Sequence, residues 1–335
     1  MGIKEVVGIV TLISEQAPDK LPKISFVTAS LSPQTVNVDR NFHQDQSVTM
    51  CNFSILRPIV HGEYSWHVMQ SCHRDRHGLD ARALIYTHGN MPTDPLHARD
   101  WEEMAAIDPL WAIMSEPEKR FGNWDINDFL RTGQEEISGL MRSASELALP
   151  RQRRRAIDFG CGVGRLTRAL HDYFPECVGV DISSSMLQKA RKITPQCEFR
   201  EASDLHSFTD GFADLIYSSL VLQHQPDKIH VYALIRDMVR VLAPGGLLVF
   251  QMPLHLALRN RIQLRRRAYR LVRAIGLSHT YAYERLKLSP IRMLALPQSA
   301  VENIVHDAKA TVVSVTHTQT PGEPFSSGIY YCTVS

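Results

Sequence analysis

The 335-residue sequence predicts an α/β protein built around a doubly wound, mostly parallel sheet. Three observations lead to this prediction. Between residues 154 and 252, short apolar runs alternate with segments of helical periodicity, as parallel strands joined by crossover helices require. The first run, Ala156–Phe159, leads into a loop with Gly160, Gly162 and Gly164, after which a helical pattern begins. Two apolar runs after residue 310 predict an antiparallel hairpin at the sheet edge.

The composition is that of a soluble globular protein with a substantial core, since 44% of the residues are hydrophobic and 21% are charged. Six scattered cysteines show no metal-ligand spacing and are expected to be reduced thiols. The apolar segment Val6–Ile13 is too short to cross a bilayer and makes a poor signal peptide. We therefore expect a cytoplasmic protein.

Residues 1–98 differ from the rest of the chain. Their short apolar runs are broken by Pro18, Pro22 and Pro33, without a sustained period of a strand or a helix. Three interpretations stay open: a small extra domain, a poorly ordered or irregular extension, and a segment outside the working protein whose natural start is Met91. We favour the second and the third.

Residues 99–150 are predicted to form a helical cap ahead of the first strand. Apolar residues from Trp101 to Ile113 indicate a helix and a turn, and those from Phe129 to Met141 a second helix. Asp125 is placed to cap the start of that second helix. The tryptophans are expected to pack in the core, with Trp124 and Phe129 as the two aromatic residues of this region that also suit a pocket wall.

Residues 151–335 are predicted to form the main domain. A Pro244-Gly245-Gly246 turn is expected to end the last crossover helix and to start the fifth strand. The predicted strands are Arg155–Phe159, Cys177–Asp181, Cys197–Glu201, Ala213–Ser218, Gly246–Met252, Thr311–Val315 and Ile329–Val334. The predicted helices are Val163–Phe174, Ser184–Ile193, Lys228–Leu242 and Ser299–Ala308.

A basic helical insertion is predicted at about residues 254–276. No acidic residue occurs from Pro253 to Arg273, whereas seven arginines lie between Arg259 and Arg273. Apolar residues at helical spacing make the predicted helix amphipathic. Three interpretations stay open: a solvated helix that packs by its apolar stripe, a surface that attracts an anionic substrate or a membrane, and a site for RNA phosphates.

Several polar residues are predicted to meet at the carboxyl ends of the strands, where doubly wound sheets bind ligands. Asp158 lies at the entrance of the glycine loop, where an anion disfavours pyrophosphate and suits a cationic ligand. Asp181 ends the second strand, where a carboxylate can accept hydrogen bonds from ribose hydroxyls. After the third and fourth strands come Asp204, Leu205, Ser218 and His224.

These residues resemble the motifs of the class I methyltransferases that depend on S-adenosylmethionine (SAM). Asp158–Gly164 is similar to the family's first motif, D/E-x-G-x-G-x-G. The stretches Val180–Met186, Asp204–Leu205, Phe212–His224 and Leu242–Gly246 resemble the next four motifs, in the same order. The resemblance covers about residues 154–334. It implies a Rossmann-like methyltransferase sheet, parallel with a C-terminal antiparallel hairpin, behind an N-terminal helical cap.

The resemblance also implies roles for individual residues. Gly160 and Gly162 would line the methionine part of SAM, with Asp158 near its ammonium group. Asp181 would bind the ribose hydroxyls and Asp204 the adenine amino group, with the backbone N–H of Leu205 on the adenine ring. Other residues expected in the cofactor site are Cys161, Gly164, Ile182, Met186 and Ser218. No metal ion is expected.

His224 is the candidate catalytic base, because it follows the fourth strand and imidazole titrates near neutral pH. The alternative is that His224 simply lines the SAM pocket. His255, just past the fifth strand, is a second candidate. The reaction implied is an in-line displacement at the methyl carbon, for which the protein mainly positions the reactants.

The acceptor is expected to be an O or N atom of a small molecule or of a membrane-associated, lipid-linked or carbohydrate-linked compound, with acidic acceptors included. The fourth strand lacks the Asn/Asp-Pro-Pro-aromatic sequence of enzymes that methylate nucleic-acid amino groups. RNA or protein methylation through the Arg259–Arg273 helix, and a non-catalytic binding module, stay as alternatives. A nicotinamide-dependent oxidoreductase would have Gly-x-Gly-x-x-Gly without the preceding Asp158. The sequence does not indicate an oligomeric state.

Overall fold

The computed structural model describes residues 94–318 and 326–335. The predictions for the first 93 residues, including the interpretation that Met91 is the natural start, lie outside the described residues. Within the described ranges, no helix is long and apolar enough to cross a membrane. The four cysteines of these ranges, Cys161, Cys177, Cys197 and Cys332, are free thiols.

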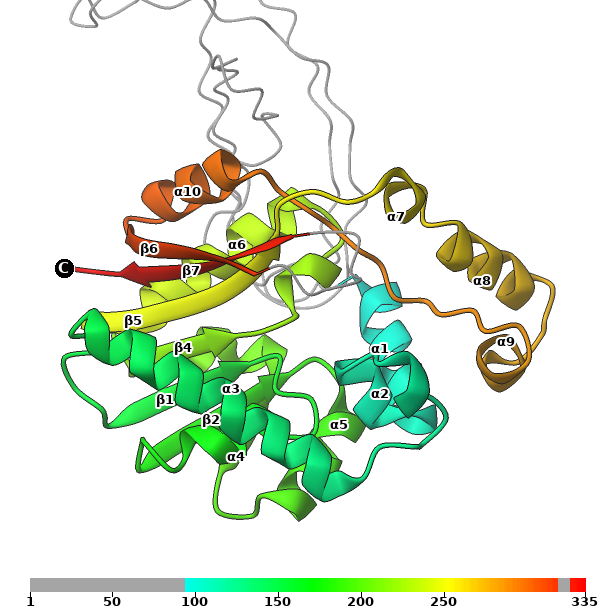
Figure 1. Cartoon of the computed structure of the whole chain (residues 1–335), viewed down its shortest axis with the longest axis horizontal. Helices are drawn as coiled ribbons and strands as arrows, with labels where there is room; N and C mark the ends of the chain where they lie inside the picture. Colours follow the sequence, from blue (N-terminus) through cyan, green and yellow to red (C-terminus); the bar gives the residue numbers. More distant parts are fainter. Residues whose placement is uncertain (1–93, 319–325) are drawn as a thin grey trace, which may run out of the picture. The chain divides into compact units, whose positions relative to one another are not determined.

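A seven-stranded sheet forms the centre of the described chain, in the order β3-β2-β1-β4-β5-β7-β6 (Figure 1). The strands β1 to β5 are parallel, and β7 is antiparallel to both of its neighbours. Their bounds are β1 Arg155–Phe159, β2 Glu176–Asp181, β3 Glu198–Glu201, β4 Ala213–Ser218, β5 Leu242–Pro253, β6 Thr311–Thr318 and β7 Ser327–Thr333. The predicted doubly wound sheet with a C-terminal antiparallel hairpin is confirmed.

Helices cover both faces of this sheet, because successive side chains of each buried strand point to opposite sides. Ile157 and Phe159 of β1 belong to a core that includes α6 and α10. Ala156, which directly precedes Ile157 and points to the opposite side, belongs to a second core with α3 and α4. The helices are α3 Ile126–Glu146, α4 Arg165–Leu170, α5 Ser184–Ile193, α6 Lys228–Val241 and α10 Gln298–Asp307.

Two short helices, α1 (Pro95–Ile107) and α2 (Pro109–Ile113), precede α3. Asp125 caps α3 as predicted, since its carboxylate accepts hydrogen bonds from the backbone N–H groups of Asn127 and Asp128 at 2.9 and 3.0 Å. The helical start of α1 lies ahead of the predicted boundary at residue 99. The N-terminal part of the described chain is thus helical.

Two strand or helix boundaries of the main domain differ from the prediction by four residues, for local reasons. Helix α4 ends at Leu170, because the backbone N–H groups of Tyr173 and Phe174 both turn back to the carbonyl oxygen of Leu170. The fifth strand begins at Leu242 and runs through the predicted Pro-Gly-Gly turn. The sheet accommodates this turn by a shift in register between β4 and β5.

The basic insertion is two helices instead of the single one predicted. Gln263 adopts a left-handed backbone conformation, with φ +53°, which separates α7 (Leu258–Ile262) from α8 (Leu264–Ala274). A further short helix, α9 (His279–Glu284), follows. These helices lie next to α1 beyond the carboxyl ends of the strands, at the right of Figure 1. Within the described residues, three short 3₁₀ turns complete the fold: η2 Pro117–Lys119, η3 Ala202–Ser207 and η4 Leu222–His224.

A close contact between α3 and α4 depends on Gly133. A Cβ atom at this position would lie 2.6 Å from the carbonyl oxygen of Arg165, the first residue of α4. The buried Arg165 side chain extends along α3 and forms an ion pair with Glu136 at 2.7 Å. Because α4 directly follows the glycine loop, this contact helps to fix the loop's position.

We predict that Gly133→Ala lowers the free energy of unfolding by about 1–3 kcal/mol, because the added methyl group overpacks the contact. Gly139→Ala, in the same helix, is the matched control, since a Cβ there meets its nearest atom at 3.8 Å. This control should raise the free energy of unfolding by about 0.5–1 kcal/mol through helix propensity. Urea unfolding measures the free energy of unfolding of both variants. Equal effects of the two substitutions would contradict the close contact at Gly133.

Candidate functional site

A cavity opens at the carboxyl ends of β1, β2 and β4, where the strand order reverses between β1 and β4. Its wall is formed by the glycine loop, the end of β2, the segment after β4, and helices α1 and α2. Six residues predicted for the site line this cavity: Gly160, Gly162, Asp181, Ile182, Met186 and His224.

The glycine loop requires glycine at two positions. Gly160 and Gly162 have φ angles of +84° and +53°, which side chains disfavour. A Cβ at Gly160 would lie 2.1 Å from a methyl carbon of Val221, and a Cβ at Gly162 would lie 2.4 Å from Ile113. The backbone N–H of Gly160 also donates to the carbonyl oxygen of Val180 at 2.7 Å. The loop is therefore held over the end of β2 with its backbone facing the cavity.

Asp181 connects this loop to the start of α5. Its Oδ2 accepts a hydrogen bond from the backbone N–H of Gly162 at 2.8 Å, and its Oδ1 one from Ser183 at 2.9 Å. Burial raises the pKa of Asp181, while these backbone N–H groups oppose the rise. A carboxylate has about four lone-pair positions, so acceptor capacity is left on the cavity side. The residue fits a ligand with hydroxyl donors.

Asp158 lies beneath the glycine loop, outside the cavity lining. It is 1% exposed, and its Oδ2 accepts a hydrogen bond from the Thr167 hydroxyl at 2.6 Å. Its Oδ1 has no hydrogen-bond partner among the described residues. Burial raises the pKa of Asp158 to about 7. Because Asp158 is buried outside the cavity lining, its predicted role beside the SAM ammonium group stays a prediction.

Five other predicted site residues do not line the cavity. Asp204 and Leu205 both belong to η3. Leu205 is fully buried in the core. Asp204 does not line the cavity, although Ala202 of the same turn does. Gly164 is packed against Phe199. The remaining two are Cys161 and Ser218, both buried. Their roles in cofactor binding stay predictions.

His224 lines the cavity from η4 and is hydrogen-bonded through both ring nitrogens. Its Nδ1 lies 2.7 Å from the carbonyl oxygen of Arg292, so Nδ1 donates to that oxygen. Its Nε2 lies 3.2 Å from the side-chain amide nitrogen of Gln223. Burial lowers the pKa of His224 to about 4. The imidazole is therefore neutral at physiological pH.

The sequence did not indicate that α1 supplies His97 and Trp101 to the cavity wall. Trp101 packs against the apolar core of this region as predicted, and its ring also lies edge-on against His224 with a centroid distance of 5.3 Å. The four-residue spacing of His97 and Trp101 on one helical face was the available signal. Trp124, proposed as a pocket wall, instead packs in a core with Phe129.

Helix α1 is held in place by three acidic side chains that bind α5 and α8. Glu102 accepts a 2.5 Å hydrogen bond from the Ser183 hydroxyl at the start of α5. Asp100 forms an ion pair with Arg270 of α8 at 2.5 Å. Glu103 accepts from the Tyr269 hydroxyl at 2.6 Å. The cavity is therefore covered by a helix fixed to both the sheet domain and the insertion.

The basic insertion uses several of its arginines inside the protein. Besides Arg270, Arg273 forms an ion pair with Glu103 at 3.0 Å, and Arg266 donates to the carbonyl oxygen of Pro290 at 3.0 Å. The predicted apolar stripe is divided: Tyr269 packs inward and is 1% exposed, whereas other members of the stripe face solvent. Leu264 and Leu271 are 63% and 65% exposed, because the acidic residues of α1 draw the arginine face inward.

Comparisons with known proteins agree with this arrangement. A family model described as "Methyltransferase domain" matches residues 157–250. The trans-aconitate 2-methyltransferase of Variovorax paradoxus (strain S110) is 33% identical over 200 residues, which cover 58% of this chain and 72% of that protein. The one from Azoarcus sp. (strain BH72) is 32% identical over 199 residues, or 56% and 77% of the two chains. This chain belongs to the class I SAM-dependent methyltransferases.

Among solved structures, magnesium protoporphyrin IX methyltransferase from Synechocystis PCC 6803, with bound S-adenosylhomocysteine, is 20% identical to this methyltransferase. The match covers 71% of this chain and 97% of that chain, with a TM-score of 0.47. As a member of its family, this enzyme uses SAM as the methyl donor. Within residues 94–318 and 326–335, no group of three or more His, Cys, Asp or Glu side chains is placed to hold a metal ion.

We predict that Asp181→Asn raises the Kd for SAM about ten- to a hundredfold, because a hydrogen bond to a charged acceptor is worth about 1.5–3 kcal/mol. Titration calorimetry on the full chain measures this change. Asp210→Asn, at an exposed carboxylate that does not line the cavity, is the matched control, and its Kd should stay within about threefold of wild type. An unchanged Kd for Asp181→Asn would contradict the assignment of this cavity to the cofactor.

Proposed function

We propose that this methyltransferase moves the methyl group of SAM to a carboxylate oxygen of a small organic acid, such as the trans-aconitate for which its relatives are named. The observation that carries the proposal is the state of His224, the candidate base at the cavity wall. An enzyme that methylates hydroxyl or ammonium groups has to remove a proton from its acceptor, whereas a carboxylate is already ionised at neutral pH.

His224 is poorly suited to remove a proton. Nδ1 carries the proton donated to the Arg292 carbonyl oxygen, and the lone pair of Nε2 faces the Gln223 amide. With a pKa lowered to about 4 by burial, the ring is a weak base. These contacts support the alternative that His224 lines the pocket and orients the acceptor. When bound, SAM supplies an activated sulfonium methyl group that a carboxylate oxygen accepts without prior deprotonation.

The electrostatic environment on the α1 side of the cavity favours an anion. Burial and then the positive charge of Arg292 lower the pKa of His97 to about 4. The guanidinium of Arg292 forms an ion pair with Asp94 at 2.9 Å. Burial, and then the positive charges of Arg292 and Arg270, lower the pKa of Arg266. Burial disfavours a charge of either sign, whereas the positive charge of Arg292, which disfavours an added cation at His97, stabilises an added carboxylate.

In the proposed reaction, one end of the cavity binds the cofactor and the other end binds the acceptor. The cofactor end comprises the Gly160–Gly162 backbone and the Asp181 carboxylate, with Asp158 beneath the loop beside the SAM ammonium group. The turn that holds Asp204 and Leu205 borders the adenine. The acceptor end comprises His97, Trp101, His224 and Gln225, which line the cavity from α1 and the segment after β4. Residues 99–150 and the insertion cover the acceptor, and the sheet domain binds the cofactor.

The experiment is an acceptor panel with the full-length enzyme and SAM, with S-adenosylhomocysteine release as the signal. Trans-aconitate and other small di- and tricarboxylic acids should turn over, and their fully esterified or amidated forms should not. Mass spectrometry should locate the added methyl group in a base-labile ester. Turnover confined to amines, alcohols or RNA would overturn the proposal, and His224→Asn then separates these cases, since loss of a true base costs about 10²–10⁴ in kcat.

A further inference from the structure

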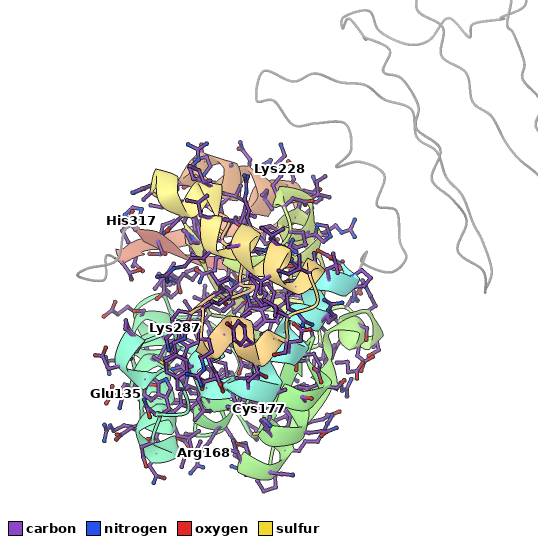
Figure 2. All side chains as sticks on the ribbon, turned by 90° about the vertical axis from the view of Figure 1, so that its right-hand side faces the viewer. Glu135, Arg168, Cys177, Lys228, Lys287 and His317 are labelled. Carbon is purple, nitrogen blue, oxygen red and sulfur yellow. The ribbon has the colours of Figure 1, made fainter. Side chains whose placement is uncertain are left out.

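Helix α8 carries an apolar face that points away from the protein. Leu264, Leu271 and Ile275 recur at helical spacing and are 63%, 65% and 69% exposed. We call these three residues the outer apolar face. The opposite side of the helix holds Tyr269, which is 1% exposed, and the arginines bound to α1. Figure 2 looks onto the side of the molecule that carries this helix.

Basic residues flank the outer apolar face. Arg265 and Arg267 of α8 and Arg261 of α7 are exposed. No acidic residue occurs anywhere from Pro253 to Tyr283. Ile262 and Leu277, which precede and follow α8, are also 36% and 37% exposed. An exposed apolar stripe bordered by arginines, without neighbouring acids in the segment, combines the two features that bind a helix to an anionic lipid surface.

We propose that the outer apolar face and its flanking arginines form a docking surface for anionic membranes. In this arrangement α8 lies in the interface plane, with Leu264, Leu271 and Ile275 among the acyl chains. Arg265 and Arg267 lie at the depth of the lipid phosphates. Docking then places the side of the enzyme that carries α1 and the cavity next to the bilayer.

An exposed apolar face also suits a second copy of this chain or the segment 1–93 of the chain, but the charges argue against both. In a two-fold dimer the same patch meets itself, which would oppose the arginines of one copy to those of the other with no acid of this segment between them. Residues 1–93 of the chain carry equal numbers of acidic and basic residues, eight of each, and so offer no excess of negative charge. An anionic lipid surface complements both features of the face.

The test is co-sedimentation of the full-length enzyme with vesicles of phosphatidylglycerol and phosphatidylcholine in equal parts, and with vesicles of phosphatidylcholine alone. Binding should be at least about tenfold stronger to the anionic vesicles and should weaken as salt is raised. The triple variant Leu264→Ser, Leu271→Ser, Ile275→Ser should lose at least about tenfold in partitioning, since it removes the inserted apolar surface. SAM binding, which uses none of these residues, should be unchanged.

Two further variants complete the test. Arg265→Gln with Arg267→Gln should remove most of the salt-sensitive part of the binding. Val313→Ser, at a 40% exposed apolar residue of β6, should bind vesicles as wild type does. Equal binding to neutral and anionic vesicles, or full binding by the triple serine variant, would overturn the proposal. So would a dimer in sedimentation that the serine variant dissociates, or RNA binding that depends on Arg265 and Arg267 in the absence of any binding to vesicles.

Discussion

The acidic face of α1 is the constraint on which the site depends. Asp100, Glu102 and Glu103 are close in sequence, yet the second binds the start of α5 and the other two bind α8. Buried or half-buried charged pairs of this kind tolerate little displacement, because losing one partner leaves a charge without compensation. Helix α1 is therefore fixed above the carboxyl ends of the strands, and His97 and Trp101 on its other face close the cavity.

Asp158 and Asp181, the two carboxylates next to the glycine loop, act differently from the acidic residues of α1. Asp181 is occupied by backbone donors from the glycine loop and from α5, so it organises the loop before any ligand binds. Asp158 retains an unpartnered oxygen in a buried position and has a raised pKa, as expected for a group whose compensating charge comes from outside the chain. The pair suits a cofactor that brings both hydroxyl donors and a positive charge.

Much of the sheet domain followed from local sequence signals. The strands β1 and β4 and helix α5 have the predicted bounds, because short apolar runs, glycines and a Ser183 cap define them within a few residues. Asp181 was found by its position at the end of a strand. The cavity wall from α1 could not be found in this way, since it rests on contacts such as Glu102 with Ser183 across 81 positions of the chain. The orientation of α8 was equally inaccessible, because amphipathicity predicts an inward apolar face and the acids of α1 reverse it.

The proposed acceptor is an anion that needs no deprotonation, and the number of protons released in each turnover tests this most directly. When a carboxylate oxygen attacks the methyl group of SAM, the products are S-adenosylhomocysteine and a methyl ester. No proton is released in this reaction. Methyl transfer to a hydroxyl group, or to an ammonium group that first loses a proton to become an amine, releases one proton for each methyl transferred. Turnover with an acid acceptor in weak buffer near pH 7.5 is followed with a pH indicator and by quantifying the product. The ratio of protons released to methyl groups transferred should be close to zero. A ratio near one would contradict the account.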